Sequence, residues 1–219
     1  MFYPIGKPIT SNWLTDNHDM RIIKALYNLF TRGAIAMKNE IQTFSVRSLT
    51  KMAICVALLC VSAYISFPLP FASAMITALT IVMNLAAFVL TPQQTLIVMV
   101  VYLLMGAAGL PVFVGGAAGF GEIMGPRGGF LLAFVIAYPI VSALKGTAYS
   151  FRRYFLIAVL VGIPLTYIGG LLSLMYFMHL ELWAAMLAAV FPFIPGDILK
   201  AAAAAYLGVK LNRIFSQED

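Results

Sequence analysis

Two oppositely charged residues, Asp197 and Lys200, stand near the end of a chain that carries few other charges. Residues three apart on a helix lie on nearly the same face, and an acid placed before a base is the favourable order for such a pair. The aspartate offers a strong acceptor and the lysine a cluster of donors. Together they are suited to hold a polar, uncharged group such as a urea or an amide.

Two interpretations of this pair stay open. In the structural one, Asp197 follows Pro195 and Gly196 and caps the last helix, while Lys200 neutralises it. In the functional one, the pair forms a binding site. An ionised side chain in a membrane helix costs about 3 kcal/mol and therefore usually faces a cavity or the interior of the bundle. The two interpretations are compatible, since a capping carboxylate can still present an oxygen to a ligand.

The composition places these charges in a membrane. The 219 residues are 62% hydrophobic and 10% charged, and the mean hydropathy is +0.95. A bilayer core requires roughly 20 apolar residues for each helical span. We therefore expect an all-α, polytopic membrane protein with six transmembrane helices, at about residues 52–67, 72–90, 93–108, 128–144, 154–178 and 196–212.

Basic residues at the ends of these runs predict the orientation. Short cytoplasmic loops carry an excess of Lys and Arg. One side collects most of the bases, namely Arg47, Lys51, Lys145, Arg152, Arg153, Lys210 and Arg213. The other side holds Arg127. We expect a multi-pass protein of the plasma membrane with both termini in the cytoplasm, and the net charge of +6 reports this topology and not a nucleic-acid partner.

The chain divides into two predicted regions. Residues 51–213 form the six-helix membrane domain, and residues 1–50 form a cytoplasmic N-terminal segment. Apolar residues at helical spacing within 20–30 are compatible with a helix on the membrane surface. Alternatively, residues 1–36 reflect an upstream start codon, because the sequence from Met37 reads as a complete start to the first span.

A glycine-rich segment separates the third and fourth predicted spans. Residues 109–129 contain eight glycines and two prolines among 21 residues, so no regular helix runs through them. Apolar, non-helical backbone next to a membrane is tolerated where it is buried in protein or lines a cavity. We expect an ordered lid or re-entrant loop on the outer face, in which Phe113 and Phe120 form an apolar wall over a small ligand.

The charges of this loop, Glu122 and Arg127, have two interpretations. They form a salt bridge with each other, or Arg127 holds the carboxylate of a ligand. Glycines also interrupt the fifth span, where Pro164, together with Gly162, Gly169 and Gly170, is expected to kink or locally loosen the helix. After this span, residues 179–195 are too short to cross and return, and we expect a brief surface helix that ends at Pro192.

Patterns of other chemistry are weak or missing. His179 and Glu181 are two residues apart, the wrong spacing for one helix face, and no second cluster completes a metal site. The glycine-rich loop lacks the Lys-Ser/Thr ending of a P-loop, and no nucleophile motif appears. We therefore expect neither an enzyme nor a bound metal or cofactor. Asn84 is expected to form an interhelical hydrogen bond.

Small residues in the first span predict a contact surface. Ala53 and Ala57 share one face of the helix, and small side chains let another helix approach closely. The partner of this face need not belong to the same chain.

Two segments carry a resemblance to a known family. "YLLMGAAGLPVFVGGAAGFGEIMGPRGGFLLAF" at 102–134 and "FIPGDILKAAAAAYL" at 193–207 closely resemble the BioY family, the biotin-binding S components of energy-coupling-factor (ECF) transporters. "LPFA" at 69–72 is similar to a "VPFT"-like turn of that family, and the resemblance covers about residues 37–212.

The resemblance implies a six-helix protein that captures biotin from outside. Asp197 would accept from the ureido N–H groups, and Lys200 would donate to the ureido carbonyl. The lid over the bicyclic ring would be lined by Phe113, Val114, Gly115, Gly116 and Phe120. Arg127 as a carboxylate ligand is a separate hypothesis, since family members often carry a smaller polar residue there.

The resemblance also implies partners. A subunit of this kind docks on a transmembrane T component that works with two cytoplasmic ATPases, here through Ala53 and Ala57. Two alternatives remain: an S component for a different vitamin, with a different site at Asp197 and Lys200, or a self-sufficient small-molecule transporter. The second should show inverted repeats, and none is detectable in the sequence.

Overall fold

The structure, a computed structural model, describes residues 45–68 and 75–217. The chain divides into two compact units, Met1–Ile41 and Gln42–Asp219, and all described residues belong to the second. The predictions for residues 1–36 and 20–30, and the resemblance at 69–72, therefore concern the chain outside the described residues.

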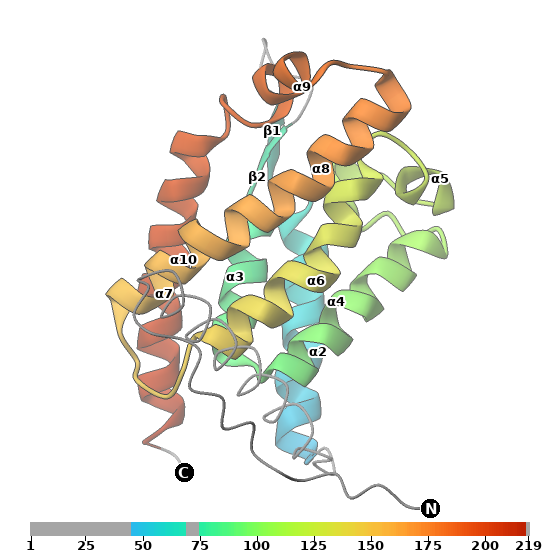
Figure 1. The fold of residues 1–219 in the computed structure, drawn as a ribbon. Helices are drawn as coiled ribbons and strands as arrows, with labels where there is room; N and C mark the ends of the chain where they lie inside the picture. The colour runs from blue at the N-terminus through green and yellow to red at the C-terminus, as the bar shows by residue number, and fades with distance from the viewer. Residues whose placement is uncertain (1–44, 69–74, 218–219) are drawn as a thin grey trace, which may run out of the picture. The chain divides into compact units, whose positions relative to one another are not determined.

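The described residues fold mainly into helices (Figure 1). The helices, in chain order, are α2 (Val46–Ser62), α3 (Leu79–Val89), α4 (Pro92–Ala107), α5 (Phe120–Ile123), α6 (Gly128–Leu144), α7 (Phe151–Ile157), α8 (Ile163–Met178), α9 (Leu182–Ala189) and α10 (Ile194–Phe215). A short 3₁₀ turn, η1 (Val114–Gly116), precedes α5, and a π-helical stretch, η2 (Ala158–Gly162), joins α7 to α8. Between α2 and α3, two short strands pair antiparallel: β1 (Ser66–Pro68) and β2 (Met75–Thr77).

Apolar side chains cover much of the exposed helix surface. The continuous helical stretch Phe151–Met178 is long and apolar enough to cross a membrane, yet only 22% of its most apolar window is buried. The helices α9 and α10, bent by 51°, form a second candidate as a broken span, and α3, α4 and α6 are apolar but shorter. A core helix of a soluble protein would be mostly buried, so these exposed apolar faces fit contact with lipid.

The hairpin corrects two expected helix boundaries. Residues 66 and 67, expected in the first span, lie in β1, and residues 75–77, expected in the second, form β2. The second helix begins only at Leu79. Pro68 cannot continue a helix. The β-branched Ile76 and Thr77 favour extended backbone.

Two predicted interruptions are confirmed. The turn at residues 91–95 starts α4 through a capping box, in which Thr91 accepts from the Gln94 backbone N–H and the Gln94 side chain accepts from the Thr91 N–H. The expected distortion near Gly162 and Pro164 appears as η2, which ends two residues before Pro164. A proline lacks the N–H that would continue the helical ladder, and wider π-turns accommodate that loss.

The carboxyl end of α3 is held by donors from two other helices. The Asn212 side chain of α10 donates to the Phe88 carbonyl at 2.9 Å. Lys145, at the end of α6, donates to the carbonyls of Ala87 and Leu90. The last carbonyls of a helix have no partner within the helix. These bonds, together with one from the Ser142 hydroxyl to the Leu90 carbonyl at 2.7 Å, satisfy them. They fix α3 against α6 and α10.

The helices α6 and α8 cross at two glycines. A Cβ added at Gly129 would lie 2.0 Å from the carbonyl oxygen of Gly169, and one added at Gly169 would lie 2.6 Å from that of Gly129. Only residues without a side chain allow the two backbones to approach so closely. These two glycines therefore set how closely α8 packs against α6.

We expect Gly169→Ala to destabilise this crossing. The new methyl group would lie 2.5 Å from the Cβ of Ala133, so the helices must separate. Overpacking of this kind costs about 1–3 kcal/mol. The measurement is the thermal unfolding temperature of the purified protein in detergent, which should fall. The control Gly121→Ala adds the same group where nothing lies within 4 Å. An unfolding temperature of Gly169→Ala at or above that of wild type contradicts the packing account.

Candidate functional site

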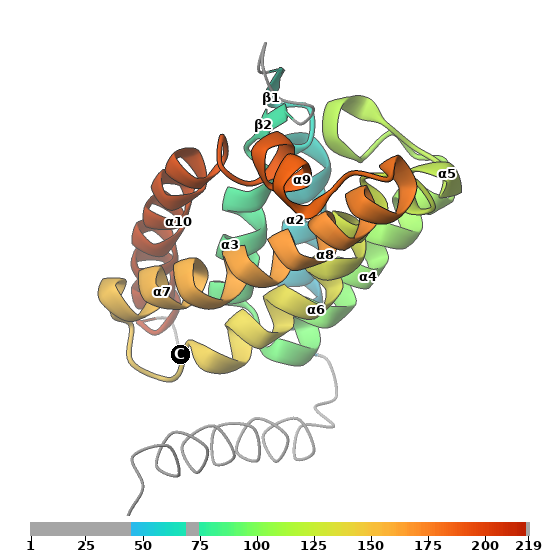
Figure 2. The same cartoon turned by 45° about the horizontal axis from the view of Figure 1, so that its top comes forward.

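A cavity of about 160 Å³ lies where the hairpin, the glycine-rich loop, α9 and the start of α10 converge. The hairpin, α5 and α9 gather at one end of the long helices (Figure 1 and Figure 2). The polar residues that line the cavity are Thr77, Thr80, Glu122, Arg127, Thr166, Tyr167, Asp197 and Lys200. Its apolar lining comes from Leu79, Phe113, Val114, Phe130, Leu131, Phe134, Leu174, Ala189 and Phe193. A cavity of about 150 Å³ is large enough to hold a six-membered ring.

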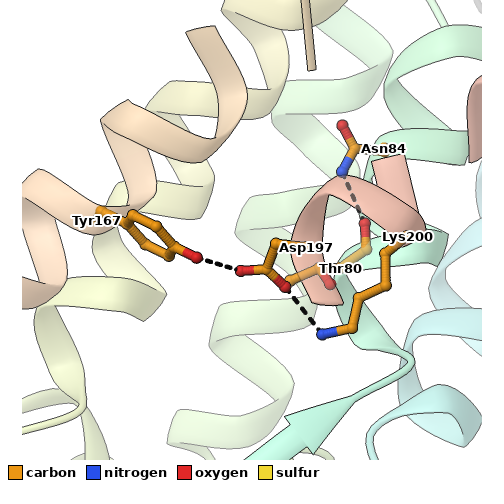
Figure 3. A network of polar contacts seen from close by, with 5 residues as sticks. All are labelled: Thr80, Asn84, Tyr167, Asp197 and Lys200. Atoms are coloured by element: carbon orange, nitrogen blue, oxygen red, sulfur yellow. Dashed lines mark hydrogen bonds and ion pairs between the residues drawn. The ribbon is translucent and has the colours of Figure 1, made fainter. Parts of the chain in front are cut away.

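Asp197 occupies the centre of a short polar network. The Lys200 ammonium lies 2.9 Å from Asp197 Oδ1. The Tyr167 hydroxyl of α8 donates to Asp197 Oδ2 at 2.6 Å. Figure 3 shows the carboxylate between the two donors. Both charged side chains are 13% exposed, so they are largely withdrawn from solvent and open mainly to the cavity.

The structural interpretation of Asp197 is wrong about the helix cap, whereas its pairing with Lys200 and its place in the first turn of the helix are confirmed. The helix α10 begins at Ile194 with Phe193 as its N-cap, and no side chain caps it. Asp197 lies inside the first turn, and its own backbone N–H donates to the Phe193 carbonyl at 2.8 Å. Its carboxylate oxygens instead accept from Tyr167 and Lys200. Pro195 occupies an early helical position, where a missing N–H costs nothing. The helix can therefore begin at Ile194, before Asp197.

The glycine-rich loop is fastened to the ends of α2 and α4. The Gly115 N–H donates to the Ala63 carbonyl at 3.1 Å, and the Gly119 N–H donates to the Gly106 carbonyl at 2.7 Å. The hydroxyl of Tyr102 donates to the Val112 carbonyl at 2.9 Å. Gly115 and Gly119 have φ values of 73° and 96°, a conformation that glycine adopts without strain. The loop is therefore held in place by hydrogen bonds to its backbone groups.

The predicted lid residues do not all reach the cavity. Phe113 and Val114 line it. The Phe113 ring is 2% exposed and packs edge-on against Tyr102. Gly115 and Gly116 lie outside the cavity lining, and Phe120 is 60% exposed. Phe113 is thus fixed in the protein, and the expected apolar wall comes from α6 as much as from the loop.

Glu122 and Arg127 both line the cavity without forming a pair. Over residues 45–68 and 75–217, the ion pair that the structure gives joins Asp197 to Lys200. The salt-bridge interpretation of the loop charges is therefore wrong. Arg127 is exposed, acts as the N-cap of α6 and belongs to the cavity lining. Its guanidinium can serve a ligand.

Two residues of α2 lie away from this site. Ala53 and Ala57 are exposed on the helix surface and do not line the cavity. The part of the chain that the structure describes leaves this small-residue face uncovered.

Sequence reasoning missed Tyr167 and Thr80. Tyr167 stands beside Thr166 in an otherwise aliphatic and glycine-rich run. Polar side chains in such a helix usually face inward, and this is the signal that could have identified Tyr167.

Asn84 donates to the Thr80 carbonyl of its own helix, so the prediction of an interhelical hydrogen bond is wrong. Thr80 Oγ1 and Asn84 Oδ1 are buried without a hydrogen-bond partner among the described residues.

The arrangement can bind a small molecule with polar groups at both ends. Asp197 and Lys200 offer an acceptor and a donor, and Arg127, an exposed residue of the same lining, offers a separate cation. Phe130 and Phe134 supply an apolar wall. Within the described ranges, no group of three or more His, Cys, Asp or Glu side chains is placed to hold a metal ion.

The comparisons with known proteins agree with one another. The family model described as the BioY family matches residues 37–217. The chain is 32% identical to "Biotin transporter BioY2" of Lactococcus lactis, over 81% of this chain and 97% of that one. It is 33% identical to "Probable biotin transporter BioY" of Bacillus subtilis, over 69% and 82%, respectively.

A solved structure shares the fold. It is the crystal structure of the S-component for biotin from an ECF-type ABC transporter, and it matches with a TM-score of 0.69 at 24% identity, over 77% of this chain and 92% of that one. The family match extends over most of the chain and includes both the glycine-rich loop and the start of α10. The chain belongs to the BioY family.

Proposed function

We propose that this protein captures biotin as the substrate-binding S component of an ECF-type transporter and so serves biotin uptake. The observation that carries the proposal is the Asp197–Lys200 pair, 2.9 Å apart and facing a largely apolar cavity. The relatives named as biotin transporters and the structural neighbour, an S-component for biotin, support the choice of ligand. A protein of this kind binds and carries its ligand and makes no covalent bond.

The ureido ring of biotin fits the chemistry of the pair. A urea is neutral, with two N–H donors and one strong carbonyl acceptor. Asp197 accepts from a ureido N–H, and Lys200 donates to the ureido oxygen. The bicyclic ring lies against Phe113, Val114 and the aromatic rings of α6. Gly115, Gly116 and Phe120 belong to the loop that closes over it.

The carboxylate end of biotin reaches Arg127. Arg127 lines the cavity and forms no ion pair with Glu122, so its guanidinium is available for a bidentate bond to a carboxylate. Two polar contacts with apolar side chains in the same cavity lining suit an amphipathic acid.

In the membrane, we propose six spans made by α2, α3, α4, α6, the α7–η2–α8 rod and α10. The exposed apolar faces support this assignment. The bases at the loop between α6 and α7 and at the end of α10, among them Lys145, Arg153 and Arg213, favour a cytoplasmic position for that end. The cavity lies at the opposite end and therefore faces outward.

The partners that we propose are a T component and two cytoplasmic ATPases. The exposed small-residue face of α2, at Ala53 and Ala57, is suited to close packing with a helix of another chain. ATP hydrolysis in the partners would tilt the loaded subunit until the cavity opens to the cytoplasm.

Binding of labelled biotin to the purified protein in detergent tests this function. Asp197→Asn removes the charged acceptor and should weaken binding by about 10- to 150-fold, the factor that corresponds to a charge-assisted hydrogen bond. The matched control Glu181→Gln changes an exposed acid outside the cavity and should bind as wild type does. A folded wild type that does not bind biotin, or an Asp197→Asn variant with wild-type affinity, contradicts the proposal.

The role of Arg127 is tested with two ligands, biotin and its uncharged amide. Arg127→Gln should weaken biotin binding by about tenfold or more, because it removes a charge-assisted contact to the carboxylate. The same change should leave binding of the amide almost unaltered. Arg152→Gln, which changes an exposed arginine of α7, is the control. Equal losses for both ligands, or none for either, rule out the carboxylate contact.

A further inference from the structure

Two tyrosine hydroxyls join the α7–η2–α8 rod to α10, one near each end of α10. The hydroxyl of Tyr167 in α8 donates to Asp197 Oδ2 at 2.6 Å. The hydroxyl of Tyr154 in α7 accepts from the Asn212 side chain at 3.1 Å. Tyr167 lines the cavity, whereas Tyr154 is fully buried outside it and stacks on Phe88 at 4.5 Å. The two bonds join the same elements, but only one touches the site.

The bond from Tyr167 gives Asp197 a second donor. Lys200 holds Oδ1 and Tyr167 holds Oδ2, so each carboxylate oxygen has a partner from a different side (Figure 3). Two donors on the two oxygens fix the plane of the carboxylate. Each oxygen can accept more than one hydrogen bond, so lone pairs remain for a ligand.

The two donors restrain Asp197 in different ways. Lys200 belongs to the same helix and moves with Asp197. In the proposed function its ammonium also donates to the ligand carbonyl. Tyr167 comes from another helix and carries no charge. A phenol ring has few rotatable bonds, so its hydroxyl is a more rigid reference point than a lysine chain. When Lys200 turns toward a ligand, Tyr167 still holds the carboxylate.

We propose that Tyr167 is a positioning residue of the binding site, which orients the Asp197 carboxylate toward the ligand N–H group. This inference rests on the proposed function. The Tyr167 hydroxyl donates its proton to Asp197. Its oxygen can therefore only accept a hydrogen bond from a ligand. The side of the cavity next to α8 therefore favours N–H donors, as a ureido ring provides.

The test compares Tyr167→Phe with Tyr154→Phe in the full chain. Each change removes one hydroxyl and keeps the ring. Two quantities are measured in detergent: the equilibrium dissociation constant for biotin, and the thermal unfolding temperature without biotin. Tyr167→Phe should bind biotin about tenfold more weakly. Tyr154→Phe should lower the unfolding temperature and keep the wild-type affinity, because its bond lies outside the cavity.

A double-mutant cycle separates positioning from a direct effect. If Tyr167 acts through Asp197, adding Tyr167→Phe to Asp197→Asn should weaken binding much less than it does in wild type. Wild-type affinity in Tyr167→Phe, equal losses of affinity in both tyrosine variants, or additive losses in the cycle would overturn the inference. Wild-type affinity in Tyr167→Phe, combined with weak binding by Asp197→Asn, would overturn the inference but leave the proposed function intact. Failure of the wild type to bind biotin would overturn the function itself.

Discussion

The need to stabilise one carboxylate in apolar surroundings governs the architecture around the cavity. A buried charge is tolerated only when it is paired and hydrogen-bonded. Asp197 meets this condition through Lys200 on its own helix and Tyr167 on α8. The second contact requires that α8 and α10 keep a fixed separation at this end of the molecule. The geometry of this polar site therefore depends on the contacts that hold α8 and α10 in place.

Close backbone contacts and terminal hydrogen bonds supply that rigidity. The helix α8 is set against α6 at Gly129 and Gly169. At the other end, Asn212 and Lys145 bond the last carbonyls of α3 and so connect α10, α6 and α3. The glycine-rich loop is joined by backbone bonds to α2 and α4. The membership of the BioY family identifies the chain as a membrane protein. Because lipid offers little hydrophobic driving force for helix association, small residues and hydrogen bonds do much to hold such helices together.

The sequence was informative where an energetic cost or the covalent geometry of a residue leaves few possible structures. Asp197 and Lys200 stood out because charges in an apolar run are expensive, and the distortion at Gly162 and Pro164 follows from the chemistry of proline. The hairpin was missed, since a short apolar strand and an apolar helix share the same composition. Tyr167 was missed as a partner of Asp197 because the two are 30 residues apart and meet only through the packing of α8 and α10. The burial of Phe113 beside Gly106 likewise depends on the tertiary fold.

An experimental structure of the protein with biotin bound tests the central claim most directly. The account predicts that the ureido ring lies in the cavity at the start of α10, with an N–H within about 3 Å of an Asp197 oxygen and the ureido oxygen within about 3 Å of the Lys200 ammonium. Biotin bound in a different place, or in this cavity with its ureido ring directed away from Asp197 and Lys200, would contradict it.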